Sequence, residues 1–381
     1  MALIGIDASR ANARERTGTE WYSYYLIQAL KRLQVPGLEY VLYSKKILQD
    51  GLEAFPPGWS GKVLHWRSQR FWNQFRLSWE LSRHPVDLFF QPTHTLPLFA
   101  PKRSVTTLHD IGFERMPKLY RPAELRYHRY SAQLAVKRAD RILTVSEFSK
   151  REIVDRYRLP PGRVTVTPLA VDPARYHPGI AEEAKEAVLA KYRLTLPFMI
   201  YVGRVEEKKN IVNLVHAFSL FKERRGVGDP VKLLLVGSPG FGIERIRREI
   251  AARKLESAVL MPGYVPETEV PALIAAAKLL LLPSWYEGFG LPIIQAQACG
   301  TPVIASDVAS MPEVGGDAAL YAGPDEPERL AEAMRSLMDD YAAWERCRSL
   351  GFENARRFSW EKTARLTMDA FLEVLGVQGP V

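Results

Sequence analysis

A chain of 381 residues exceeds one ordinary hydrophobic core, so two α/β domains are the first expectation. Hydrophobic residues make up 47% and charged residues 25%, which is ordinary for a globular protein, and two cysteines are too few for a disulfide framework. The longest apolar run, residues 279–282, is far too short to cross a bilayer, and the N-terminus lacks the pattern of a signal peptide. These properties exclude a disulfide-stapled secreted domain and predict a cytoplasmic location.

Positive charge is concentrated in the first half of the chain. Residues 1–175 carry 28 Lys and Arg against 16 Asp and Glu, a net charge of +12, whereas the remaining residues have a net charge of −3. This asymmetry favours contact with an anionic membrane surface, a phosphorylated acceptor or nucleic acid, although a solvated basic surface explains it equally well. No nucleic-acid-binding module is recognisable, so we expect no nucleic-acid partner.

Strand-like runs alternate with helical patterns along the chain, which is typical of parallel α/β layers. In the first half the expected strands are 2–6, 40–43, 88–91, 104–108, 141–145 and 164–168, and the expected helices are 20–33 and 123–139. Residues 169–178 are interrupted by prolines and predict a linker. Further strands are expected at 198–202, 232–236, 259–261, 279–282, 302–305 and 319–321, with helices at 210–224 and 243–254 and others beginning at Glu269 and Leu291.

This pattern predicts two successive Rossmann-like domains, residues 1–172 and 173–358, facing a cleft. In such sheets ligands bind beyond the carboxyl ends of the strands. Candidate site residues are therefore sought where a predicted strand ends.

The segment 67–79 holds an aromatic stripe at helical spacing, formed by Phe71, Phe75 and Trp79. Off this stripe lie Arg67, Arg70 and Trp72. One interpretation is a helix whose stripe packs on the first sheet. The other is a surface, bordered by Lys102 and Arg103, that docks on an anionic membrane and recruits a lipid-linked acceptor.

The most specific motif runs from Pro283 through Glu287, Gly288 and Gly290 to Pro292. An apolar strand precedes it, and proline is tolerated in the first helical turn that follows. Glycines allow the backbone to approach a ligand closely, and N–H groups at a helix start attract anions and hydroxyl oxygens. Gly-x-Gly alone would indicate only a strand-turn-helix junction, but the whole string is far more specific.

A second motif, Gly203-Arg204 followed by Lys209, also lies between a strand and a helix. A guanidinium and an ammonium five residues apart suit a diphosphate. A solvated basic turn is the alternative, above all for Lys208. A third motif, His109-Asp110, follows the strand 104–108, where a histidine can exchange hydrogen bonds with a substrate.

Other chemistries find no support in the sequence. There is no His-Glu-x-x-His, Cys-x-x-Cys or acidic metal cluster, no Walker-type phosphate loop and no Gly-x-Ser-x-Gly elbow. We therefore expect no metal and no cofactor.

Taken together, these residues resemble glycosyltransferase family 4, the retaining nucleotide-sugar glycosyltransferases of the two-Rossmann GT-B fold. The resembling segments are 17–19, 107–110, 144–149, 168–172, 203–209, 260–265 and 358–363. The resemblance covers nearly the whole chain. It also implies that residues 359–381 form a C-terminal helix that returns to the first, acceptor-binding domain.

The resemblance implies roles for individual residues. Arg204 and Lys209 would stabilise the departing diphosphate, as a metal does elsewhere, while Glu287 holds the donor sugar and His109 contacts it from the other domain. The remaining donor-binding residues would be Gly18, Gly203, Tyr264, Phe289, Gly290, Leu291 and Gln295. The implied reaction moves a hexose of the mannose or glucose type from a nucleoside diphosphate sugar to a hydroxyl of a glycan or lipid-linked acceptor.

One residue departs from the family pattern, which has a second Glu where this chain has Gln295. An amide keeps one acceptor oxygen but loses the charge, so its hydrogen bonds to a ribose are weaker. The alternative function is therefore a catalytically impaired sugar-nucleotide-binding protein on the same fold.

Overall fold

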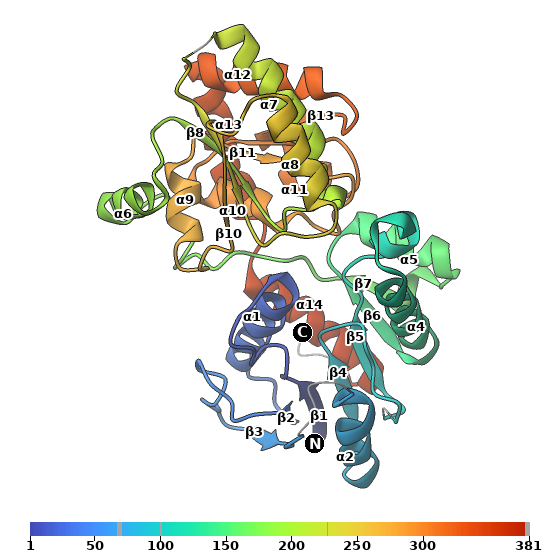
Figure 1. Ribbon diagram of the computed structural model, residues 1–381. Coiled ribbons are helices and arrows are strands. Elements are labelled where there is room, and N and C mark those ends of the chain that lie inside the picture. Colours follow the sequence, from blue (N-terminus) through green and yellow to red (C-terminus); the bar gives the residue numbers. More distant parts are fainter. Residues whose placement is uncertain (67–70, 100, 227, 378–381) are drawn as a thin grey trace. The chain divides into compact units, whose positions relative to one another are not determined.

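The computed structural model describes residues 1–66, 71–99, 101–226 and 228–377, which divide into two compact units (Figure 1). Unit 1 comprises the described residues of 1–115, 121–169 and 359–377, and unit 2 comprises those of 116–120 and 170–358. The change of unit after Leu169 lies within the expected linker, three residues before the expected boundary at 172.

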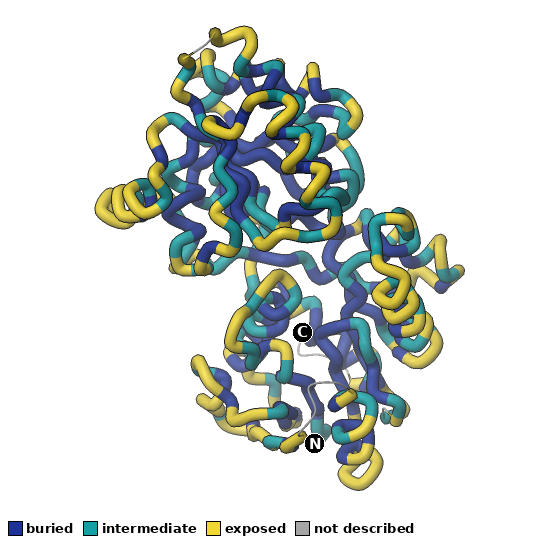
Figure 2. The backbone as a smooth tube through the Cα atoms, in the orientation of Figure 1, coloured by how far each residue is buried: buried dark blue, intermediate teal, exposed yellow. Residues whose placement is uncertain are grey.

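Unit 1 is built on a seven-stranded, wholly parallel sheet in the order β3-β2-β1-β4-β5-β6-β7. The strands are β1 (Ala2–Asp7), β2 (Leu38–Ser44), β3 (Trp59–Val63), β4 (Leu88–Gln91), β5 (Ser104–Thr107), β6 (Arg141–Thr144) and β7 (Val164–Val166). The central strands are buried on both faces, as parallel strands covered by helices must be (Figure 2).

The helices of unit 1 are α1 (Gly18–Arg32), the π-helical turn η1 (Asn73–Leu77), α2 (Ser78–Arg83), α3 (Gly112–Arg115), α4 (Pro122–Arg138), α5 (Glu147–Tyr157), the 3-10 turn η3 (Pro161–Arg163) and α14 (Trp360–Leu375). The last helix of the chain thus belongs to unit 1, as expected. Phe371 packs on Phe90 of the sheet with ring centroids 5.0 Å apart, and the Thr363 hydroxyl donates to the Pro168 carbonyl at 2.6 Å.

Unit 2 repeats the architecture with a six-stranded parallel sheet in the order β10-β9-β8-β11-β12-β13. Its strands are β8 (Phe198–Val202), β9 (Lys232–Val236), β10 (Val259–Gly263), β11 (Leu279–Leu282), β12 (Val303–Ser306) and β13 (Ala319–Ala322). Their near-continuous aliphatic runs suit strands buried on both faces.

The helices of unit 2 are α6 (Glu182–Tyr192), α7 (Ile211–Arg225), α8 (Ile243–Ala252), α9 (Val270–Ala276), α10 (Leu291–Cys299), α11 (Met311–Gly315), α12 (Pro327–Asp339) and α13 (Tyr341–Ala355). Short 3-10 turns are η2 (Pro117–Leu119), η4 (Glu207–Lys209) and η5 (Gly316–Ala318). The predicted α/β fold with two Rossmann-like domains is confirmed.

The aromatic stripe of the sequence does not pack on the first sheet, so that interpretation is wrong. Phe71, Phe75 and Trp79 are 63%, 57% and 51% exposed. Trp72 is buried in their place, and its indole N–H donates to the Leu64 carbonyl at 2.9 Å. The neighbouring Arg67 and Arg70 lie outside the described residues.

Candidate functional site

The strand order of unit 2 brings two of the predicted loops to one point of the sheet. β8 and β11 are neighbours, and the sheet continues from β8 to β9 on one side and from β11 to β12 on the other. Doubly wound sheets bind ligands outside the carboxyl ends of strands at such a switch point. The loop after β8 carries Arg204 and Lys209, and the loop after β11 carries Glu287.

Two glycines allow the loops after β8 and β9 to touch through their backbones. The Gly203 amide donates to the Val236 carbonyl at 2.9 Å, and a Cβ on Gly237 would lie 1.9 Å from the Gly203 carbonyl oxygen. Their φ angles of +151° and +141° are ones that other residues rarely adopt. Gly237 is missing from the sequence prediction, although a glycine directly after an apolar strand was a usable signal.

Arg204 presents its guanidinium to solvent from a well-anchored backbone. The Tyr201 hydroxyl donates to the Arg204 carbonyl at 2.9 Å, and burial, with the carboxylates of Glu287 and Glu206, raises the pKa of this phenol well above its ordinary value. The Arg204 side chain is 61% exposed, and its Nε lies 3.8 Å from a Glu206 oxygen. The loop therefore fixes where the arginine starts and leaves its charged end accessible.

Lys209 and Glu287 form a half-buried ion pair. The Lys209 ammonium donates to both Glu287 carboxylate oxygens at 2.7 Å, and the Ser284 hydroxyl donates to one of them, also at 2.7 Å. The Ser310 hydroxyl holds the Glu287 carbonyl at 2.8 Å. Ser284 and Ser310 were not predicted from the sequence, since a serine near a turn carries no distinctive signal.

Lys208, expected to be solvated, has local partners instead. Its ammonium lies 3.3 Å from a Glu206 carboxylate oxygen and 5.0 Å from the centre of the Tyr120 ring. It is therefore a natural control for the neighbouring Lys209.

The start of α10 lies directly after Glu287. Gly290 precedes the helix with φ +90°, and the first turn of an α-helix leaves its N–H groups outside the intrahelical ladder. Phe289 is buried against Phe358, with ring centroids 5.5 Å apart, so the backbone of residues 289–291 is held in place. Gln295 lies on α10 and is 8% exposed.

Tyr264 follows β10, the strand at the far edge of this sheet. Gly263 before it adopts φ +80°, and the Tyr264 side chain is 51% exposed. An accessible aromatic ring is able to stack on a base, which is the contact implied for this residue.

Unit 1 has its own switch point between β1 and β4. In the loop after β1, Gly18 begins α1, and a Cβ at Gly18 would meet no atom within 4 Å. The Glu20 carboxylate accepts the Thr17 hydroxyl at 2.5 Å and pairs with Arg10 at 2.8 Å. This helix start is therefore ordered and open to a ligand.

His109 lies after β5, one strand from that switch point. Burial lowers the pKa of its imidazole, with Asp110 opposing the shift. Its Nε2 lies 3.3 Å from the Pro92 carbonyl, and its ring packs edge-on against Tyr22 with centroids 4.6 Å apart. A carbonyl only accepts, so a neutral ring that donates Nε2–H to it keeps Nδ1 as an acceptor.

A polar cluster at the same edge of unit 1 escaped the sequence analysis. Among the described residues, four buried polar atoms here have no hydrogen-bond partner: Ser9 Oγ, Asn73 Oδ1, Gln74 Oε1 and His94 Nε2. Ser9 follows β1 and His94 follows β4, while the amide nitrogens of Asn73 and Gln74 donate to the carbonyls of Thr95 and Leu96 at 3.0 and 3.1 Å. Buried polar atoms without partners are costly, which indicates a place where a ligand completes the hydrogen bonds.

Other chemistries have little to work with in the part of the chain that the structure describes. No three His, Cys, Asp or Glu side chains there are grouped as ligands for a metal ion. Cys299 and Cys347 are buried free thiols, and burial raises the pKa of Cys299 to about 12, so it stays protonated. None of the described helices has the length and apolarity to cross a bilayer.

The geometry defines a class of protein. The edge of unit 2 combines two cations, a carboxylate, a helix start and glycine-opened backbone, which suits a phosphorylated, polyhydroxylated ligand. The edge of unit 1 offers a neutral histidine and unpaired polar atoms, which suit hydroxyl groups. Two Rossmann-like units with these sites are the architecture of nucleotide-sugar-dependent glycosyltransferases.

Comparison with known proteins agrees with this class. The family model for glycosyl transferases group 1 matches residues 185–357, and that for glycosyltransferase family 4 matches residues 16–175. The chain is 36% identical to the O-antigen chain mannosyltransferase B of Escherichia coli over 299 residues, which cover 78% of this chain and 77% of that protein. It is 33% identical over 257 residues to the D-inositol 3-phosphate glycosyltransferase of Salinispora tropica, covering 63% and 52% of the two chains. The chain belongs to the family 4 glycosyltransferases, the glycosyl transferases group 1.

Solved structures show the same fold. The sucrose-phosphate synthase of Thermosynechococcus elongatus matches with a TM-score of 0.74 and 20% identity, covering 99% of this chain and 100% of that one. HepE of Anabaena in complex with UDP-glucose matches with a TM-score of 0.73 and 18% identity, covering 97% and 99%. The GT-B architecture expected from the resemblance is thereby confirmed.

Proposed function

We propose that this glycosyltransferase is retaining and metal-independent, and that it moves a hexose of the mannose or glucose type from a nucleoside diphosphate to a hydroxyl of a glycan or lipid-linked acceptor. The reaction would serve glycan, polysaccharide or glycolipid synthesis. The observation that carries the proposal is the Lys209–Glu287 ion pair beside the start of α10, at the switch point of unit 2. The mannosyltransferase relative and the UDP-glucose complex of HepE support a hexose as the transferred group.

In unit 2, Arg204 and Lys209 would meet the diphosphate. Negative charge grows on the departing phosphate as its bond to the sugar breaks, and prearranged cations stabilise that charge most strongly in the transition state. Glu287 would accept hydrogen bonds from donor-sugar hydroxyls while it orients Lys209. The N–H groups of residues 289–291 would bind the same sugar.

In unit 1, the acceptor and the sugar would meet neutral polar groups. His109, kept neutral by burial, would accept a sugar hydroxyl at Nδ1. The unpaired atoms of Ser9, Asn73, Gln74 and His94 would bind hydroxyls of the acceptor.

Retention would follow from attack on the face that the leaving group occupies. The bond between the anomeric carbon and the diphosphate oxygen breaks, the bond from that carbon to the acceptor oxygen forms on the same face, and the acceptor's proton passes to the departing phosphate. This balance requires no protein nucleophile, and cations in place of a metal supply the charge stabilisation.

The experiment incubates the purified chain with UDP-, GDP-, ADP- and dTDP-hexoses in EDTA and, separately, in Mn²⁺. Release of nucleoside diphosphate is measured, and NMR identifies the anomer formed first. We expect turnover of at least one donor in EDTA, with the donor's anomeric configuration retained. Arg204→Ala should lower that rate by roughly two to three decades.

Three outcomes contradict parts of the proposal. Loss of activity in EDTA with rescue by Mn²⁺ contradicts metal independence, and an inverted anomer contradicts retention. Tight donor binding without any turnover favours the impaired, sugar-nucleotide-binding alternative to which Gln295 points.

A further inference from the structure

Unit 1 carries an exposed aromatic surface that the proposed reaction does not use. It is formed by Phe71, Phe75, Trp79 and Phe99, whose side chains are 63%, 57%, 51% and 65% exposed. Single apolar residues at a surface are ordinary, whereas a contiguous group of large ones marks an interaction site. We name these four residues the aromatic face.

Printed contacts join these residues into one surface. The rings of Phe71 and Phe75 lie edge to face with centroids 6.1 Å apart. The Phe99 amide donates to the hydroxyl of Ser78, the residue before Trp79, at 3.3 Å. The two stretches of chain are thus held side by side, and α2 projects from unit 1 next to β4 (Figure 1).

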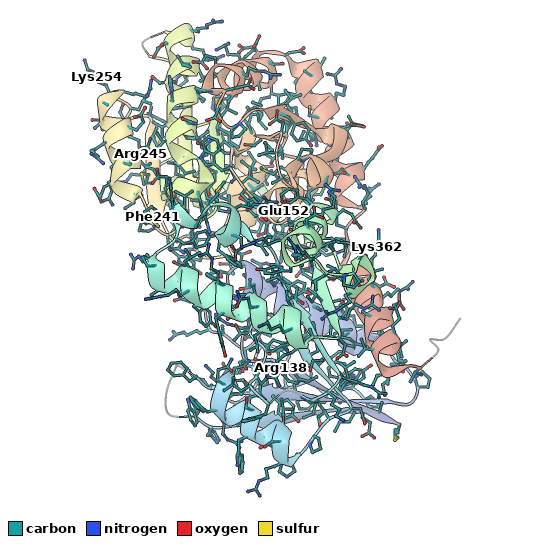
Figure 3. The ribbon with its side chains drawn as sticks, turned by 90° about the vertical axis from the view of Figure 1, so that its right-hand side faces the viewer. Arg138, Glu152, Phe241, Arg245, Lys254 and Lys362 are labelled. Atoms are coloured by element: carbon teal, nitrogen blue, oxygen red, sulfur yellow. The ribbon has the colours of Figure 1, made fainter. Side chains whose placement is uncertain are left out.

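Positive charge surrounds the aromatic face. The guanidiniums of Arg76 and Arg83 lie 5.1 and 5.4 Å from the centre of the Trp79 ring. Arg138, at the end of α4 (Figure 3), donates to the Leu98 carbonyl beside Phe99, and Lys102 is exposed three residues further on. Cations stacked on aromatic rings keep their charge available to a further anionic partner.

Negative charge is withheld from the same surface. Between residues 71 and 84 the sequence has a single acid, Glu80, and its side chain is only 2% exposed. Its carboxylate pairs with Lys62 at 2.5 Å and with Arg76 at 3.0 Å. Burial raises the pKa of Glu80, but these hydrogen bonds outweigh it and lower the pKa, so the carboxylate stays ionised beneath its cations.

We propose that the aromatic face docks on the surface of an anionic lipid bilayer. Phe and Trp insert at the boundary between headgroups and acyl chains, and arginines beside them bind lipid phosphates. A second copy of the chain is the weaker occupant, because pairing this face with itself would bring arginines together without an exposed acid to neutralise them.

The location of the face gives docking a purpose. Phe71 and Phe75 flank Asn73, whose amide donates to the Thr95 carbonyl in the polar cluster at the edge of unit 1. A protein held at the bilayer by this face places that cluster next to the membrane. This step rests on the proposed function, and it specifies the acceptor as lipid-linked.

The experiment is co-sedimentation of the full chain with vesicles of phosphatidylcholine alone, or with roughly one-third phosphatidylglycerol, at low and high salt. We expect binding to the anionic vesicles at low salt, and weaker binding to neutral vesicles and at high salt. Phe75→Ser with Trp79→Ser should lower partitioning about tenfold or more, since two exposed aromatic side chains lose their insertion. Tyr341→Ser, an exposed tyrosine of unit 2, is the matched control and should bind like the wild type.

A second pair of variants tests the charge. Arg83→Glu with Lys102→Glu should reduce partitioning at low salt by more than about tenfold, since each basic residue contributes about fivefold. Lys254→Glu, an exposed lysine on unit 2 (Figure 3), controls for net charge and should have a much smaller effect.

Two results overturn the proposal: no sedimentation with anionic vesicles at low salt, or undiminished binding by the Phe75 and Trp79 double variant. Donor turnover in the absence of vesicles is measured on the same samples and should equal that of the wild type. Failure of docking with intact turnover leaves the proposed function standing, and failure of turnover alone leaves docking standing.

Discussion

Both carboxylate oxygens of Glu287 lie 2.7 Å from the ammonium of Lys209, although the two residues are 78 positions apart in the chain. The pair forms because β8 and β11 are hydrogen-bonded neighbours and their loops leave the same edge of the sheet. An anionic ligand at this edge meets a lysine whose position is already set by the carboxylate. Positioning before the reaction is what makes an electrostatic contact effective in catalysis.

The first prediction concerns this pair. Lys209→Ala and Glu287→Ala should each lower kcat/KM by roughly two to three decades, or about 2–4 kcal/mol of transition-state stabilisation, because each removes part of one charge-stabilising unit. The double variant should be little worse than either single variant, since residues in direct contact are not independent. Lys208→Ala is the matched control and should keep near-normal kcat/KM. Fully additive effects would show that the two residues act separately.

The second prediction concerns Gly237. Gly237→Ala should destabilise unit 2 by about 3 kcal/mol or more, because the new Cβ lies 1.9 Å from the Gly203 carbonyl oxygen and φ is +141°. Chemical denaturation measures the free energy of unfolding. Gly162→Ala, where a Cβ meets no atom within 4 Å, should change it little. Equal stability of the two variants would contradict the close crossing of the loops after β8 and β9.

The third prediction concerns two glutamines of α10. Gln295→Glu should preserve or lower the donor KM if residue 295 faces the ribose, because a carboxylate offers two charged acceptors. Gln297 is the contrasting residue: its amide donates to the Gly315 carbonyl at 3.1 Å and accepts from Asn354 at 2.7 Å. Gln297→Glu should therefore cost about 1–3 kcal/mol of stability, since it leaves a buried carbonyl unpaired, without a specific change in donor KM. A raised donor KM for Gln295→Glu would show a pocket organised around the amide.

The fourth prediction concerns pH. Burial, assisted by the nearby His128 and His109, lowers the pKa of His94 from 6.5 to about 3. Below pH 6.5 the unfolded chain binds a proton at this position and the folded chain does not, so stability falls as the pH falls toward 3. The slope from His94 reaches about 1.4 kcal/mol per pH unit.

The measurement compares the unfolding free energies of the wild type and His94→Gln between pH 7 and roughly pH 4. The difference should shift in favour of the variant as the pH decreases. A pH-independent difference would show that His94 takes up its proton in the folded state as readily as in the unfolded one.

Much of the architecture is legible in the sequence. The aliphatic runs of β8, β9 and β11 and the proline-glycine punctuation around Glu287 report local preferences, which act between residues close in the chain. The motif residues Gly203, Arg204, Lys209 and Glu287 were found in the same way, because strand ends are local features. The edge strand β3 was missed, since Trp-Ser-Gly-Lys-Val has little of the alternation of an ordinary strand.

Tertiary structure decided which of these local features meet. Helical spacing shows that Phe71, Phe75 and Trp79 share a face, but only packing decides whether that face is covered, and here Trp72 took the buried position. The unpaired atoms around His94 come from separate segments, and no local pattern signals an unmet hydrogen bond. Lys209 meets Glu287 because strand order is settled by crossover connections between distant segments, whose cost and gain no short window of sequence contains.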